Sequence, residues 1–216
     1  DFSGCGGSIG TWATGARISY SSVTLPSGMG GVAVDGPPAL CVIAGCAGAF
    51  GRRPDAVVAG VNPGTNTGRA VLHSGTVAAA LTALTFARPA VAVSMVVTPV
   101  MQWDAAARLT VAPLAWLAHQ PRPLALNVNV PDVPYERIAG IEVTRLGRRH
   151  KAQPVLPAKN PRGETVYWVG PAGGAREAGP GTDFYALERG AVSITPLQVD
   201  LTHANQIPLV AGWMDK

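Results

Sequence analysis

The chain has 216 residues, of which 47% are hydrophobic and only 14% are charged, and its formal net charge is +4. A chain of this size and composition can bury one sizeable core, which excludes a disordered tail. The small positive excess suits an anionic small molecule but does not by itself indicate a stable complex with nucleic acid.

The first half of the chain alternates apolar strand patterns with small-residue helix patterns. Helices are predicted at 39–50, 74–87 and 103–119, with Pro113 as a kink or break, and strands at 55–60, 90–97 and 124–130. This alternation predicts a Rossmann-like α/β fold, a parallel sheet flanked by helical crossovers. The low-charge run from residue 74 to 101 is interrupted by Arg88-Pro89 and Pro99. It is therefore not expected to span a membrane.

The character of the sequence changes after Pro131. Prolines and glycines separate short strand candidates at 140–145, 165–170 and 191–198. We therefore expect a core over residues 1–131 and a β-rich extension over 132–216.

The three cysteines, Cys5, Cys41 and Cys46, are odd in number and lack metal-ligand spacing. This usage favours reduced thiols in a cytoplasmic protein. Cys41 and Cys46 are expected in the core, and Cys5 is expected to be a small filler beside glycines rather than a reactive thiol.

The most informative segment is the loop GVNPGTNTGRAVLHSGTV at residues 60–77, which leads from a strand into a helix. The amides of Asn62 and Asn66 offer neutral oxygens to a cation and N–H groups to an anion. Ser74 is predicted as an N-cap, so that Gly75 and Thr76 present free backbone N–H groups to a phosphate. The alternative is a tight crossover turn in which the asparagines only serve positive φ angles.

Several motifs along the chain resemble the SurE family of metal-dependent nucleotidases. The loop resembles its GxNxGxNxG segment followed by SGTV, and other matches follow in the family's order at 3–8, 36–42, 126–131, 162–168, 181–184 and 193–197. The resemblance implies a SurE-like parallel sheet with a C-terminal hairpin that contacts neighbouring subunits, hence a homodimer or homotetramer, and a final helix. Tyr167 and Trp168 would suit that contact, although capping of the chain's own core is the alternative.

The resemblance also implies roles for individual residues. Ser3 and Asn62 correspond to neutral ligands of a divalent metal, Mg²⁺ or Mn²⁺. Asn66, Ser74, Gly75 and Thr76 would hold the phosphate, with Asn66, Ser74 and Thr76 stabilising the charge that develops during hydrolysis.

The main metal ligands of the family are two adjacent aspartates in an Asn-Asp-Asp-Gly element, which this sequence does not contain. We expect that element to precede Asp1 in the full protein, rather than to have been lost naturally. The metal site depends on it, because a hydroxyl and an amide oxygen bind such cations only weakly without carboxylates.

Two residues that flank the site depart from the family pattern. Arg69 stands where an acidic residue is usual, and it either contacts a phosphate or is a solvated surface charge. His73 stands where tyrosine is usual, and it is either a general acid or, as we favour, a packing or capping residue. Leu40 also replaces a usual aspartate.

Outside the loop, the basic run Arg145, Arg148, Arg149, His150 and Lys151 is expected to be a solvated loop rather than a polyphosphate contact. Asp183 is expected to form a turn rather than to bind a ligand.

These expectations leave three functional hypotheses. The preferred one is a phosphomonoester hydrolase acting on nucleoside 5′- or 3′-monophosphates. The second is a noncatalytic relative that binds a nucleotide or a protein partner. The third is a phosphatase specialised for a modified nucleotide or a sugar phosphate.

Overall fold

A computed structural model describes residues 18–151, 154–170 and 173–214 of the chain. The expectations for Ser3 and Cys5 lie outside these residues. No helix within the described ranges is long and apolar enough to cross a membrane.

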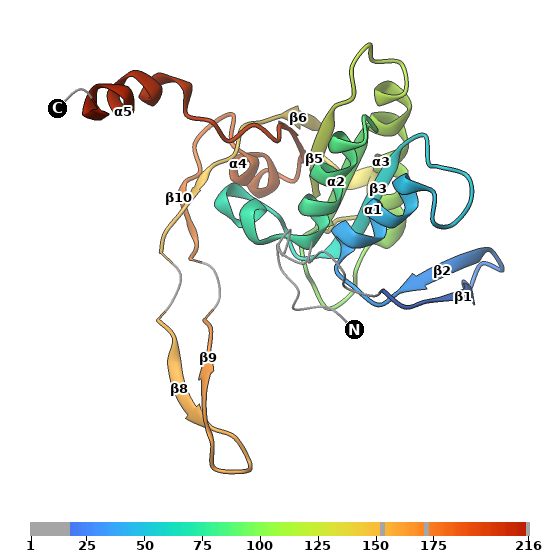
Figure 1. The fold of residues 1–216 in the computed structure, drawn as a ribbon, viewed down its shortest axis with the longest axis horizontal. Coiled ribbons are helices and arrows are strands. Elements are labelled where there is room, and N and C mark those ends of the chain that lie inside the picture. Colours follow the sequence, from blue (N-terminus) through green and yellow to red (C-terminus); the bar gives the residue numbers. More distant parts are fainter. Residues whose placement is uncertain (1–17, 152–153, 171–172, 215–216) are drawn as a thin grey trace.

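The central element is a five-stranded sheet in the order β3-β4-β5-β11-β6 (Figure 1). Strands β3 (Val57–Pro63), β4 (Ala90–Met95) and β5 (Ala125–Val130) are mutually parallel. Strand β11 (Val192–Leu197) pairs antiparallel with β5, and β6 (Ile141–Val143) pairs parallel with β11. The α/β prediction is confirmed. The last two strands come from the region after residue 131, so the C-terminal part also completes the central sheet.

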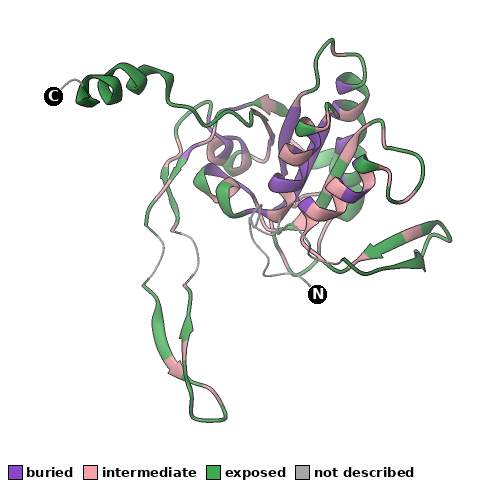
Figure 2. Ribbon diagram, in the orientation of Figure 1, coloured by how far each residue is buried: buried purple, intermediate pink, exposed green. Residues whose placement is uncertain are grey.

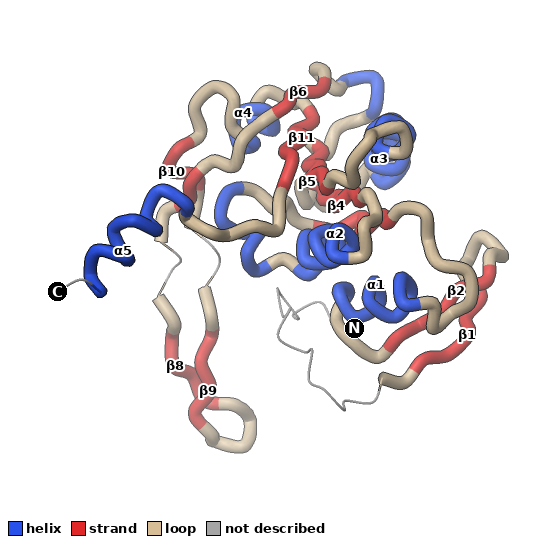
Figure 3. The backbone as a smooth tube through the Cα atoms, turned by 45° about the horizontal axis from the view of Figure 1, so that its top comes forward, coloured by secondary structure: helices blue, strands red, loops and turns tan. Residues whose placement is uncertain are grey.

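Helices cover both faces of the sheet, with α1 (Pro38–Ala47) and α2 (Gly75–Thr85) side by side on one face and α3 (Trp103–Leu117) on the other (Figure 3). On the α3 side, Leu109 and Leu117 join a buried cluster with Val91, Val93 and Met95. On the α2 side, alanines pack against Ala90 and Ala92. Because both faces are covered, all six residues of β4 are buried, as in other parallel sheets.

Helix boundaries follow local chemistry. Helix α1 ends at Gly48, whose φ of 92° is the left-handed conformation of a C-cap. Helix α3 runs through Pro113 to Leu117, so of the kink or break predicted at Pro113, the break does not occur. Cys46 is buried and Cys41 is half-buried, which agrees with their expected core positions. Burial raises the pKa of both thiols.

The remaining elements lie around or beyond this body. They are β1 (Tyr20–Thr24), β2 (Gly30–Val34), β7 (Arg148–Arg149), β8 (Leu156–Lys159), β9 (Thr165–Trp168), β10 (Ala175–Glu177), α4 (Asp183–Glu188) and α5 (Ile207–Met214), with 3-10 turns at Gly68–His73 (η2), Tyr135–Arg137 and Ala204–Gln206. Strands β1 and β2 form a hairpin that the sequence patterns did not predict. The β8–β9 hairpin and α5 project away from the sheet and are mostly exposed (Figure 2).

Candidate functional site

The candidate site begins where β3 ends at the edge of the sheet. The backbone N–H of Gly64 donates to the carbonyl of Met95, 2.9 Å away, so the loop after β3 is fixed to the end of β4. These are the carboxyl ends of parallel strands, where open α/β sheets bind ligands.

Asn62 is half-buried near the end of β3, just before this loop. Its Nδ2 donates to the carbonyl oxygen of Gly64 at 2.6 Å. That partner is only an acceptor, so the amide must present its N–H₂ group there and its Oδ1 on the other side. Within the described ranges Oδ1 accepts no hydrogen bond, which makes it available as a neutral ligand.

Asn66 is buried, and hydrogen bonds from residues of β4 and β5 hold it in place. Its backbone N–H donates to Asn129 Oδ1 at 2.8 Å, and its carbonyl accepts from Asn127 Nδ2 at 2.8 Å. Its side-chain Nδ2 donates to Ser94 Oγ at 2.6 Å. One amide N–H of Asn66 is thus committed to the protein, and since the second N–H has no acceptor among the described residues, it can bind an anion.

Sequence reasoning gave no individual role to Ser94, Asn127 and Asn129, although all three are fully buried. The signal was the alternation in Asn127-Val128-Asn129, since residues two apart on a strand share a face. Buried amides require hydrogen-bond partners, and the loop supplies them to Asn127 Nδ2 and to both polar atoms of the Asn129 side chain, whereas Asn127 Oδ1 has no partner among the described residues.

Ser74 is the N-cap of α2, as predicted. Its Oγ accepts a hydrogen bond from the backbone N–H of Val77 at 3.1 Å, and the residue is buried. The next two residues, Gly75 and Thr76, are half-buried, and their N–H groups lie in the first turn, where no intrahelical acceptor exists. These donors and the helix dipole suit an anion.

Arg69 and His73 both lie on the turn η2 and are exposed. Neither makes a side-chain hydrogen bond or ion pair with another residue in the described ranges. For Arg69, a phosphate contact or a solvated charge, and for His73, a general acid or a packing or capping residue, therefore all remain possible readings.

The basic run divides into two parts. Arg145 and Arg148 form ion pairs with Glu177 at 2.6 and 3.2 Å, and both are well exposed. Arg149 instead points inward, where its Nη2 donates to Thr67 Oγ1 at 2.6 Å. Burial lowers the pKa of the Arg149 guanidinium, and the nearby Asp183 carboxylate opposes that shift. For Arg149, the expectation of a solvated loop is wrong, because β7 points successive side chains to opposite sides.

Asp183 is fully buried at the first turn of α4, and its carboxylate accepts from the backbone N–H groups of Gly68 and Gly147. It also accepts from the backbone N–H of Phe184 at 3.0 Å, so it bonds to the site loop as well as to its own turn. Sequence reasoning missed this contact, which joins residues 115 positions apart.

Fold and site together define a class: an α/β protein with an amide-rich loop and a capped helix N-terminus at the carboxyl edge of its sheet, an arrangement suited to an anionic ligand. Comparison with known proteins gives the family. Residues 1–153 match the family described as "Survival protein SurE".

Individual relatives agree with this match. Proteins named 5′-nucleotidase SurE from Nitrosomonas europaea and Halorhodospira halophila are each 49% identical to this chain, over 84% of it and 74% of their own length. The crystal structure of the SurE protein from Aquifex aeolicus superposes with a TM-score of 0.75 at 30% identity, covering 94% of this chain and 81% of that one. The chain belongs to the SurE family, as its motifs predicted.

Proposed function

We propose that this protein is a phosphomonoester hydrolase that releases phosphate from nucleoside monophosphates. The observation that carries the proposal is the capped N-terminus of α2, which follows an amide-rich loop in a chain 49% identical to proteins named 5′-nucleotidase. Those names favour the 5′ over the 3′ phosphate. We also propose that the protein is cytoplasmic, as its cysteine usage led us to expect.

The phosphate is held by donors from one continuous segment. Gly75 and Thr76 donate backbone N–H groups, Ser74 donates its hydroxyl hydrogen while its oxygen caps α2, and Asn66 donates its second amide N–H. Asn66, Ser74 and Thr76 also stabilise the charge that develops on the phosphoryl oxygens. Fixed donors do so without reorganising during the reaction.

The divalent metal, Mg²⁺ or Mn²⁺, fits Asn62 as one neutral ligand, and Ser3 is the second in the proposal. Within the described residues no group of three or more His, Cys, Asp or Glu side chains converges on a common point. Neutral oxygens alone bind such ions weakly, so the proposal requires carboxylates from outside the described residues. When bound, the metal would supply polarisation of the phosphoryl group and a more acidic water.

A phosphate-release assay on the intact gene product tests this proposal. With AMP as substrate, we expect Mn²⁺ to stimulate phosphate release and a chelator to abolish it. Asn62→Ala should raise the Mn²⁺ concentration needed for half-maximal activity, whereas Asn205→Ala, at an exposed asparagine, should not. AMP binding without turnover would favour the noncatalytic alternative, and turnover only of other phosphomonoesters would favour the specialised phosphatase.

We also propose a homodimer or homotetramer. Tyr167 and Trp168 on β9 are each 67% exposed, and Trp213 on α5 is 73% exposed. Large apolar side chains grouped on projecting elements gain burial when another chain covers them. Sedimentation of the protein as a monomer at micromolar concentration would contradict this part of the proposal.

A further inference from the structure

The carboxylate of Asp183 binds two backbone segments at once. Its Oδ2 accepts from the N–H of Gly68 at 2.6 Å, and its Oδ1 accepts from the N–H of Gly147 at 2.9 Å. The residue is fully buried. Removing one of these donors would leave a buried charge short of a hydrogen bond, which is unfavourable. Asp183 therefore resists any movement of Gly68.

Arg149 binds the residue before Gly68. Its Nε donates to the carbonyl of Thr67 at 3.1 Å, and its Nη2 donates to Thr67 Oγ1 at 2.6 Å. The guanidinium itself is placed over the ring of Phe184, 5.0 Å from its centre. The planar guanidinium holds two separate donor nitrogens in a fixed geometry against one residue, which the single ammonium nitrogen of lysine cannot reproduce.

Close packing leaves this contact little freedom. Gly68 has a φ of 55°, and a Cβ there would lie 2.9 Å from the carbonyl oxygen of Gly147. A Cβ on Gly147 would lie 2.5 Å from Cδ2 of Phe184. The site loop and the C-terminal part thus approach each other more closely than side chains at these two positions would permit.

Asn66 lies between two sets of contacts. On the sheet side, Ser94, Asn127 and Asn129 bind it, and on the other side Asp183 and Arg149 bind the two residues that follow it. We propose that Asp183 and Arg149 are positioning residues of the phosphate site, which hold Thr67 and Gly68 so that Asn66 keeps its place. This inference rests on the proposed function for Asn66, and it gives the C-terminal part of the chain a role in that site.

The test combines amide hydrogen exchange with phosphate release from AMP, both in the intact chain. In Asp183→Asn we expect the Gly68 amide to exchange at least about tenfold faster, because it loses a charged acceptor. We expect kcat/KM to fall about tenfold to a hundredfold, the size of effect that a displacement of about 1 Å produces. Arg149→Lys, a milder change, should show smaller effects of the same kind.

Leu117→Ala is the matched control. Leu117 is buried at the end of α3 and contacts the core instead of the loop, so its loss destabilises the protein without moving Gly68. In Leu117→Ala, the rate at which the Gly68 amide exchanges through local opening, and kcat/KM, should both stay near the values of the parent protein.

Three outcomes would overturn the inference: no faster exchange at Gly68 in either Asp183→Asn or Arg149→Lys, faster exchange with unchanged kcat/KM, or an equal fall in kcat/KM in Leu117→Ala. If the parent protein releases no phosphate, the proposed function fails. The exchange data and the affinity for AMP then decide whether Asp183 and Arg149 position the loop.

Discussion

The carboxyl edge of the sheet and the two projecting arms, the β8–β9 hairpin and α5, differ in where their side chains find partners. At the edge, Asn127 and Asn129 bond to Asn66, Ser74 caps α2 and Arg149 bonds to Thr67, and β4 and β5 are buried throughout. The arms are exposed along almost their whole length (Figure 2), and their tyrosine, tryptophan and leucine side chains are among the exposed large hydrophobic residues.

The two regions are therefore stabilised in different ways. The sheet and its loop are held by contacts inside one chain, so their geometry is set before any ligand arrives. The arms have few such contacts, and their apolar side chains would become buried only in the proposed oligomer, where another chain covers them. A substitution in the sheet should therefore reduce the free energy of unfolding, and a substitution in an arm should reduce association.

The largest effect is expected from Met95→Ala. Met95 ends β4 and is fully buried in the cluster beneath α3. Truncation leaves a cavity, and we expect the free energy of unfolding to fall by about 2–5 kcal/mol in urea titrations. Val97→Ala, two residues further at an exposed site, should change it by less than about 0.5 kcal/mol. Equal effects at both positions would contradict the contrast between sheet and surface.

A smaller effect is expected at Ser74, where folding and binding can be separated. Ser74→Ala removes the acceptor for the Val77 N–H and should cost about 1 kcal/mol of stability. Ser74→Asp keeps an N-cap acceptor, so thermal unfolding should change little, but its negative charge should repel a phosphate and weaken AMP binding. Unchanged AMP binding in Ser74→Asp would exclude the start of α2 as the phosphate site.

The sequence was a good guide wherever a pattern is local. Residues 74–87 show a cap and a run of small apolar residues, and the structure places α2 at Gly75–Thr85. The short apolar run of β4 was found in the same way, because buried strands carry few polar residues. The strand predicted at 124–130 matches β5 as well, although two of the six residues of β5 are buried asparagines. The motifs also predicted the family.

The parts that sequence could not predict depend on long-range contacts. No local signal places β11 beside β5, antiparallel to it, because pairing partners are chosen in three dimensions. The β1–β2 hairpin is rich in serine and glycine and lacks a clear apolar alternation. Arg149 looked like one of several surface charges, and only the folded chain shows that it bonds to Thr67, 82 positions away.

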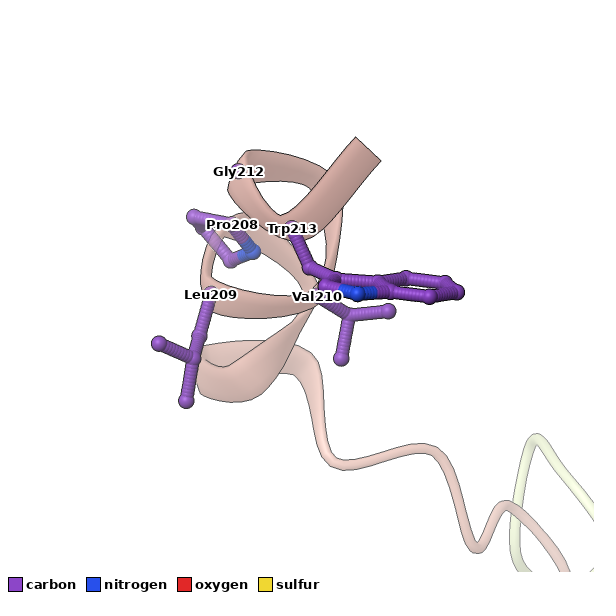
Figure 4. A pocket seen from close by; sticks show the side chains of 5 residues that line it. All are labelled: Pro208, Leu209, Val210, Gly212 and Trp213. Carbon is purple, nitrogen blue, oxygen red and sulfur yellow. The ribbon is translucent and has the colours of Figure 1, made fainter. Parts of the chain in front are cut away.

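The smallest effect on folding is expected at Trp213, where the arm is tested directly. Pro208, Leu209, Val210, Gly212 and Trp213 line a hollow on α5 (Figure 4), and Leu209 and Trp213 are 74% and 73% exposed. Trp213→Ala therefore removes little that the single chain has buried. We expect unchanged unfolding at low protein concentration, and a weaker rise of the unfolding midpoint with concentration, because association stabilises the folded state by mass action. Sedimentation velocity over about 1–50 µM should show the same loss of association.

Trp116→Ala, at a half-exposed tryptophan on α3, is the control and should retain the parent's association. If Trp213→Ala and the parent associate equally, α5 is not part of the contact between copies, and the β8–β9 hairpin would have to supply it alone.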